Sequence, residues 1–291
     1  MNKAALLLTI ALSPLPLAAE PLQFNWQQTR ATVTETVKED NSIVKKMRYD
    51  IELQAQQDGT FLLKHNNHSL LSQKTEKSNQ PNELNYKTTT LTTTFPDLLI
   101  GSSGEFLDAP GWDEHYAKML NIVEQMPEGK GANTVMLNPE LSAALKVKFM
   151  LEPWCAWVCL WAGLDPKNPP PSSVSETQLF GFPFDLKDNY QVLNSSKNSV
   201  TLRYSSIAII RKDKPIDDSF FGYRRNTENR KIWTKKQMKL GNQVVKSTQI
   251  TATLDRHTLQ PQKVELFIKQ PQSQDLIGAA ETTNIYEFKW H

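Results

Sequence analysis

The two cysteines, Cys155 and Cys159, are the side chains of this sequence best suited to redox or metal chemistry. Their spacing places both on one face of a helix, where Cβ atoms four residues apart lie about 5–6 Å from each other. A disulfide needs a Cβ separation of about 3.5–4.5 Å, so the bond requires a local distortion of the helix, which Pro153 can provide. Residues 1–19, described below, predict export from the cytoplasm. Because paired thiols outside the cytoplasm usually oxidise, we expect a structural disulfide, with two buried free thiols as the alternative.

A Cu(I) site is a further hypothesis for the same pair, because soft thiolates bind Cu(I). Such a site needs a nearby His or Met and a polar approach, whereas the residues around the pair are Trp, Val and Leu. A thioredoxin-type role requires two intervening residues instead of the three found here. We therefore predict no metal and no cofactor.

The histidines and acidic residues form no strong catalytic pattern. His65 and His68 lie three residues apart on a predicted strand, so they point to opposite faces unless Asn66-Asn67 turns the chain. Asp113-Glu114-His115 begins a predicted helix, where capping and the helix dipole explain an acidic first turn. The sequence has no nucleophile elbow, Gly-rich phosphate loop, HExxH motif or EF-hand. These observations favour a non-enzymatic protein and leave an enzyme without a recognisable motif as the third hypothesis.

Residues 1–19 have the pattern of a cleavable secretory signal peptide. Lys3 gives a short positive region, residues 4–12 form an apolar run, and Leu17-Ala18-Ala19 ends in the small residues that a signal peptidase accepts. The run is too short for a permanent anchor, and we expect no integral membrane segment in the mature chain. We predict a periplasmic or secreted protein after cleavage near Ala19.

The charge balance bears on the partners. The net charge is +2 for the full chain and becomes +1 when residues 1–19, which contain Lys3 and no acid, are removed. A near-neutral chain lacks the basic field that attracts nucleic acid, so we predict no nucleic-acid partner.

Alternation of apolar and polar residues with a period of two dominates both ends of the chain and predicts β-strands. Asp58-Gly59 predicts a hairpin turn between two of them. The sequence predicts strands in two sets, the first at 26–38, 47–55, 61–65, 84–95, 98–100 and 105–107, and the second at 200–210, 232–240, 244–254, 264–269 and 276–290.

Between the two strand sets, the apolar period changes to 3.6, which predicts helices within residues 113–163. Pro153 either kinks the second helix or starts a third. Trp154, Trp157 and Trp161 then share one helix face. Such a stripe is typical of a core, and the functional alternative is an aromatic wall for an apolar or carbohydrate ligand, with Tyr116 of the first helix as a further candidate.

This order of elements predicts an α+β protein with a mostly antiparallel curved sheet or incomplete barrel. An insert of two to three helices covers its concave face, because each sheet face needs a cover. We predict a single β-rich domain over residues 20–291. It comprises a first strand set at 24–107, a helical insert at 113–163, a Pro-rich connector at 164–175 and a second strand set at 184–290.

Two short motifs carry a resemblance to known proteins. Gly104-Glu-Phe-Leu-Asp-Ala-Pro-Gly111-Trp112 before a helix, and Trp157-Val-Cys-Leu-Trp161-Ala-Gly163 after it, resemble a pattern in exported bacterial β-rich proteins of unknown function. The resemblance covers residues 85–255 and implies no site. In outline, the predicted architecture is also similar to periplasmic lipoprotein carriers, whose curved sheets hold acyl chains under helical lids.

Two classes of function therefore come first. The leading hypothesis is a binding protein that holds a hydrophobic or amphipathic ligand between sheet and helices. The alternative is an envelope scaffold or interaction protein that contacts another envelope protein through its strand edges or the charged loop at 211–230.

Overall fold

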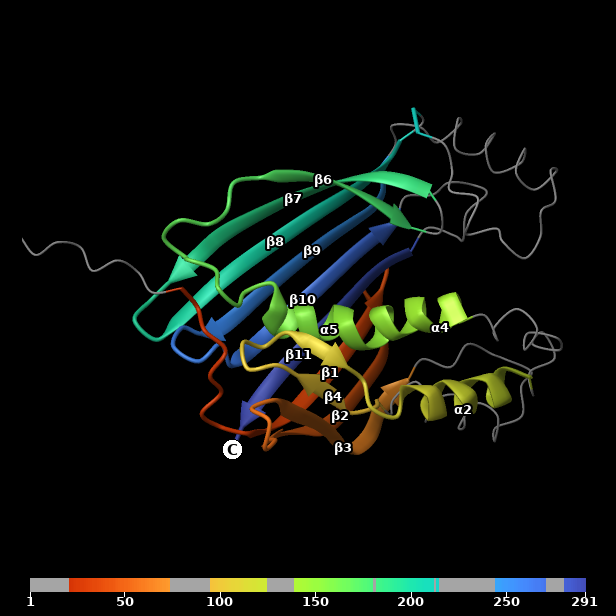
Figure 1. Ribbon diagram of the computed structural model, residues 1–291, viewed down its shortest axis with the longest axis vertical. Coiled ribbons are helices and arrows are strands. Elements are labelled where there is room, and N and C mark those ends of the chain that lie inside the picture. Colours follow the sequence, from red (N-terminus) through yellow and green to blue (C-terminus); the bar gives the residue numbers. More distant parts are fainter. Residues whose placement is uncertain are drawn as a thin grey trace, which may run out of the picture.

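The computed structural model describes residues 21–73, 95–124, 139–179, 182–211, 213–214, 244–270 and 280–291. In these ranges the chain forms one open antiparallel sheet of 11 strands, with helices lying against one face (Figure 1). The strand order is β5-β4-β3-β2-β1-β11-β10-β9-β8-β7-β6. The prediction of a mostly antiparallel sheet with a helical insert is confirmed, although the insert is small.

The first strand set forms one end of the sheet. It consists of β1 (Arg30–Glu39), β2 (Ser42–Ala55), β3 (Phe61–Gln73), β4 (Leu98–Ile100) and β5 (Phe106–Asp108). The turn between β2 and β3 is the predicted one, because Gly59 has a φ of +83° and Asp58 Oδ1 accepts a 3.0 Å hydrogen bond from the Thr60 amide.

The second strand set forms the rest of the sheet. It consists of β6 (Ser173–Leu179), β7 (Phe182–Ser195), β8 (Ser199–Ile210), β9 (Val244–Asp255), β10 (Pro261–Gln270) and β11 (Ala280–Trp290). The last strand joins the sets, since β11 pairs with β1 in the register Val33↔Phe288 and Glu35↔Tyr286. The first and last described strands, β1 and β11, are therefore paired at the centre of the sheet, and β5 and β6 form its outer edges.

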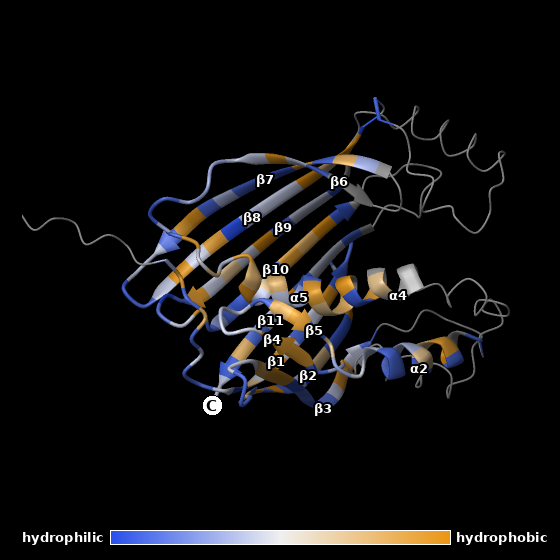
Figure 2. Ribbon diagram, in the orientation of Figure 1, coloured by the Kyte–Doolittle hydropathy of each residue, from blue (hydrophilic) through white to orange (hydrophobic). Residues whose placement is uncertain are grey.

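The alternation of side chains decides which face is covered. In β2, Met47, Tyr49, Ile51 and Leu53 are buried, while the residues between them are more exposed. The same parity continues across the sheet, and the buried residues form one main core cluster that spans β1 to β4 and β8 to β11. Figure 2 shows apolar residues concentrated on the helices and on the neighbouring strands. The core therefore lies between one sheet face and the helical insert.

The helical insert begins with α2 (Trp112–Glu124) and continues with α4 (Pro139–Lys146), η2 (Val147–Leu151), α5 (Glu152–Trp154) and η3 (Cys155–Cys159). The last four follow one another without a break, and we call them the central helix. η2 and η3 are π-helical turns, and Pro153 lies between them in the first turn of α5. Proline thus neither ends the helix nor starts a separate one. It has no N–H to donate, and the helix continues through the i→i+5 hydrogen bonds of the π turns, such as that from the Glu152 N–H to the Val147 carbonyl.

Some predictions fall on other parts of the chain. The signal peptide at 1–19, the strands at 84–95 and 232–240, and most of the loop at 211–230 lie outside the described residues. The strand that starts at Phe61 is longer than predicted, because it continues to Gln73 through an irregular register near His68.

Candidate functional site

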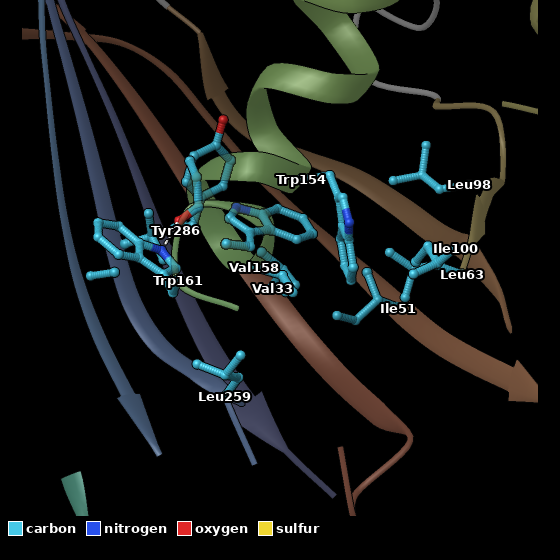
Figure 3. Packing of buried hydrophobic residues seen from close by; sticks show 14 of the residues in the cluster. Val33, Ile51, Leu63, Leu98, Ile100, Trp154, Val158, Trp161, Leu259 and Tyr286 are labelled. Carbon is cyan, nitrogen blue, oxygen red and sulfur yellow. Dashed lines mark hydrogen bonds between the residues drawn. The ribbon is translucent and has the colours of Figure 1, made fainter. Parts of the chain in front are cut away.

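The central helix places Trp154 directly against the sheet (Figure 3). Trp154 is fully buried, and its indole N–H donates a 2.8 Å hydrogen bond to the Gly104 carbonyl. Its ring lies 5.5 Å from that of Trp26 and 5.9 Å from that of Phe24. Trp157 packs edge-on against Tyr286 and Phe288, with ring centroids 5.3 and 5.1 Å apart. The helix is thus fixed by aromatic packing near β11.

The other two predicted ligand residues lie apart from this cluster. Trp161 is fully buried, and its indole N–H donates to the Ala156 carbonyl at 2.8 Å. Tyr116 stacks on Trp112 within α2, with ring centroids 5.9 Å apart. Neither residue lines the pockets described below. Ligand binding by the tryptophans and by Tyr116 stays a prediction.

The predicted disulfide is not present in the structure, because Cys155 and Cys159 are free thiols. Both lie in the continuous η3 turn, so the helix is not interrupted at the pair. The Pro153 distortion that the bond required does not bring them together. Instead the Cys155 thiol donates a hydrogen bond to Cys159, which raises the pKa of Cys155 and lowers that of Cys159.

A pocket of about 210 Å³ lies on one side of the central helix, and we call it the β8–β10 pocket. Its apolar wall consists of Leu160, Ile250, Leu266 and Ile268. Glu152, Cys155, Tyr204, Ser206, Lys246 and Thr248 complete the lining. A concave site with a mainly apolar wall and a few polar groups is typical of small-molecule binding.

The polar groups of this pocket are already oriented by neighbours. The Tyr204 hydroxyl donates a 2.7 Å hydrogen bond to Asp188 on β7, and burial together with this carboxylate raises the pKa of Tyr204. Lys246 Nζ lies 3.5 Å from Glu152 Oε1, so β9 and the central helix are joined by a partly exposed ion pair. The pocket therefore has an apolar wall and a charged rim.

A second, smaller cavity of about 30 Å³ lies on the opposite side of the central helix, and we call it the Glu35 cavity. Its walls are aromatic and apolar except for Glu35 and His65. Its lining comprises Glu35, Tyr49, His65, Phe95, Leu98, Phe149, Met150, Pro153, Trp154, Trp157 and Tyr286.

Glu35 is an acid within the core. It is 5% exposed, and its Oε2 atom has no hydrogen-bond partner in the described part of the chain. Burial raises the pKa of the Glu35 carboxyl, and the positive charge of Lys45 opposes this in part. Glu35 in turn raises the pKa of Tyr49 and Tyr286, whose own burial is the larger cause. A neutral carboxyl is therefore favoured at this position.

His65 and His68 lie on the same face of β3, next to Tyr49. The register of β2 and β3 shifts between Arg48 and Asp50, and Asn67 has a φ of +54°. The resulting bulge places the His68 ring 5.5 Å from Tyr49 and stacked on it, with the His65 ring 5.9 Å from Tyr49. The question that the sequence left open at Asn66-Asn67 is thus answered by a bulge within β3, which brings both rings to one face without a turn of the chain.

Sequence reasoning missed Glu35, although a signal for it existed. Ala31, Val33, Glu35 and Val37 alternate, so the acid occupies an apolar position of its strand. The pocket residues of β8 to β10 were not predicted either, because their polar members follow the ordinary alternation of a half-exposed strand.

Two further findings on the described residues concern metal ions and membranes. Among them, no group of three or more His, Cys, Asp or Glu side chains lies close enough together to hold a metal ion. None of the helices in the described ranges combines the length and the apolar composition needed to cross a membrane.

No protein-family model and no curated protein matches the chain. A structure describing lipid–protein interactions in lipovitellin is similar with a TM-score of 0.38 and 7% identity, and the match covers 90% of this chain. The chain spans only 25% of the lipovitellin chain. A porin-like protein from Bacteroides uniformis is similar with a TM-score of 0.20 and 8% identity, over 94% of this chain and 100% of that one. Both TM-scores are too low to assign a family or a function.

Proposed function

We propose that the protein is a non-enzymatic binding protein for an amphipathic small molecule, which it holds in the β8–β10 pocket. The observation that carries this proposal is the pocket itself, of about 210 Å³, between the central helix and the sheet. The apolar tail of the ligand packs on Leu160, Ile250 and Leu266, because burial of each methylene contributes about 0.8 kcal/mol.

The polar end of the ligand lies at the rim of the pocket. Lys246 and Glu152 are both partly exposed there, with side-chain exposures of 31% and 38%. Exposed ion pairs are weak, so a ligand group replaces their mutual contact at small cost. Ser206 and Thr248 add hydroxyl groups next to this pair. We infer that the bound molecule carries a polar or charged head at one end and a short apolar chain at the other.

We further propose that the protein works outside the cytoplasm. The support is the composition of residues 1–19, with one cation, a short apolar run and a terminal Ala-Ala. Expression of the full chain in a bacterial host, with fractionation and N-terminal sequencing, tests this. A mature N-terminus near Glu20 in the periplasm or medium supports export, and an uncleaved chain in the cytoplasm contradicts it.

A fluorescent probe with an apolar ring system and one acidic group, 1-anilinonaphthalene-8-sulfonate, tests the pocket. We expect saturable binding at one site, with displacement by medium-chain fatty acids. The substitution Thr248→Phe fills the pocket from the β9 side and should weaken binding at least tenfold, because the added ring occupies the space of the ligand.

The control for this variant lies on the same strand. Thr251 is on the opposite face of β9, as the alternation of buried residues shows, so Thr251→Phe adds the same ring outside the pocket. Binding should persist in Thr251→Phe. Equal loss in both variants, or equal binding in both, would contradict a site in the β8–β10 pocket.

A further inference from the structure

Three residues that line the Glu35 cavity have a buried polar atom without a hydrogen-bond partner among the described residues. Trp157 Nε1 is a donor, whereas Glu35 Oε2 and His65 Nδ1 can accept. The His65 ring donates a hydrogen bond to the Pro96 carbonyl. Because Nδ1 has no partner, the donor is Nε2, and Nδ1 of the neutral ring is an acceptor. A buried acceptor without a partner costs about 1–3 kcal/mol, so Glu35 Oε2 and His65 Nδ1 favour a guest that donates hydrogen bonds.

The walls of the cavity suit a cation. Tyr49, Phe95, Trp157 and Tyr286 surround it, and π-faces of aromatic rings attract ammonium groups. Glu35 is the acid within this aromatic enclosure, and it lies 5% exposed to solvent. An acid and several rings around one space are the groups that recognise organic ammonium ions.

The size of the cavity selects among cations. A volume of about 30 Å³ holds roughly two water-sized groups. A primary ammonium nitrogen and the carbon attached to it fit this space, whereas a quaternary ammonium with several methyl groups does not. Phe149 lines the cavity and is 38% exposed, so the rest of such a molecule extends to solvent past this ring.

We propose that the Glu35 cavity is a binding site for the primary ammonium group of an alkylamine. The ammonium N–H groups donate to Glu35 Oε2 and to His65 Nδ1, and the aromatic rings surround the adjacent methylene. On entry of the neutral amine, the Glu35 carboxyl transfers its proton to the amine nitrogen, which yields the ammonium and the carboxylate together. This site lies across the central helix from the β8–β10 pocket, so it is independent of the function proposed above.

Other charged and titratable groups near Glu35 would also change their charge with pH. Lys45 and Tyr49 of β2, Tyr286 of β11, His65 and His68 of β3, and Glu152 of the central helix all lie close enough to influence the local charges. The comparison is therefore made between variants at one pH, rather than between pH values.

Calorimetric titration of the full chain with n-propylamine tests the proposal, with n-propanol as the neutral molecule of the same length. We expect propylamine to bind at least tenfold more tightly than propanol, because hydrogen bonds to a charged group contribute about 1.5–3 kcal/mol. Tetramethylammonium should bind at least tenfold more weakly than propylamine. Equal affinities for propylamine and propanol would overturn the proposal.

Two variants separate the cavity from other acids. Glu35→Gln keeps the shape of the side chain and should reduce propylamine binding at least tenfold. Glu287→Gln removes an exposed acid next to Tyr286 in the chain, on the other face of β11, and should leave propylamine binding unchanged. Equal binding by Glu35→Gln and the wild type would place the amine elsewhere.

Crystals of the wild-type protein soaked in n-propylamine give a test that does not depend on folding of the variants. Difference density for the alkyl chain near Phe149, with the nitrogen against Glu35, supports the proposal. Density for water alone in the cavity overturns it.

Discussion

The two sides of the central helix contain the same kind of sheet but are filled differently. Toward β1 to β4, the space is closed by large side chains, among them Tyr49, Ile51, Leu63 and Trp154, each at most 1% exposed. Toward β7 to β9, Tyr204 and Thr248 are only partly buried, and a pocket of about 210 Å³ remains. Alternation alone therefore does not decide whether a sheet face becomes core, because a face also needs enough side chains opposite it.

The N-terminal segment explains much of the difference. Leu22, Phe24 and Trp26 are buried. The Leu22 backbone forms hydrogen bonds with Leu164 and Gly163 at 2.8 and 2.7 Å, and the Trp26 indole N–H donates to the Leu259 carbonyl at 3.3 Å. The Trp26 ring lies 4.8 Å from that of Trp290. This segment adds a second row of aromatic residues beside the central helix. On the β7 to β9 side, the main core cluster includes aliphatic residues such as Leu202 and Ile250, and a small separate cluster consists of Phe184, Ile210 and Ala208.

The largest predicted effect of a single substitution is on the filled side. Trp154→Ala should lower the free energy of unfolding by about 3–5 kcal/mol, since it removes a fully buried ring and its hydrogen bond to Gly104. Chemical denaturation followed by circular dichroism measures the change. The control Leu193→Ala, on β7, truncates a 43% exposed side chain and should change the value by less than about 0.5 kcal/mol. Similar losses in both variants would contradict the difference between the two sides.

The next largest effect is a loss of stability at low pH, which arises from His65 on the filled side. Burial lowers the pKa of His65 to about 3 from its ordinary value of 6.5. Between these values the unfolded chain takes up a proton that the folded chain does not, so stability falls as the pH decreases from 6.5 toward 3. The free energy of unfolding changes by at most about 1.4 kcal/mol per pH unit through this one group. In His65→Asn, thermal denaturation between pH 4 and 7 should show a smaller slope, and an unchanged slope would assign it to other groups.

Glu35 gives the opposite dependence on pH. Because burial raises its pKa above 4.5, the folded chain retains a proton that the unfolded chain loses. Stability therefore decreases as the pH rises above about 4.5, until the folded carboxyl also ionises. Glu35→Gln should be more stable than the wild type at pH 7 and close to it at pH 4. Denaturation curves at the two pH values test this, and the same difference at both would show that Glu35 is not responsible.

The smallest predicted effect is on the pocket side. Tyr204→Phe removes the hydroxyl that donates to Asp188 at 2.7 Å. Because both residues are partly buried and water can replace the bond, we expect a loss of about 0.5–1.5 kcal/mol. Differential scanning calorimetry measures it, and Tyr190→Phe, on the neighbouring strand with no such bond to Asp188 among the described contacts, is the comparison. A loss as large as that of Trp154→Ala would indicate that this side is as tightly filled as the other.

The sequence predicted many of the strands because their alternation is local, but no strand was predicted at β6 or β7, and the predicted connector at 164–175 overlaps the start of β6. The hairpin at Asp58-Gly59 and the meander of β9 to β11 were predicted, since turn residues and a period of two report directly on the backbone. The pairing of β1 with β11 was not predicted, because it joins residues about 250 positions apart. No local pattern contains that information.

The candidate sites were predicted less well for the same reason. The Trp stripe correctly indicated a helix that packs on the sheet, but the free volume beside it depends on residues from β8, β9 and β10 together. The prediction of a Cys155–Cys159 disulfide was wrong. It relied on a distortion of the helix at Pro153, whereas the helix continues past this proline into a π turn that contains both cysteines as free thiols. The Glu35 cavity combines residues of β1, β2, β3 and β11 with the central helix, and no local pattern contains that arrangement.

The π-helical turns also make the chain length of the central helix important. A π turn contains one residue more per hydrogen-bonded ring than an α turn, and η2 precedes Trp154 by only three residues. Deleting one residue from η2 would remove the extra residue that the π turn accommodates, so the segment would return to α-helical pitch while Trp154 and Trp157 keep facing the sheet. Deleting a residue from α4 would instead rotate that helix by about 100° relative to the residues after it. The π turns are therefore the places in the central helix where the number of residues can change with the least effect on its contact with the sheet.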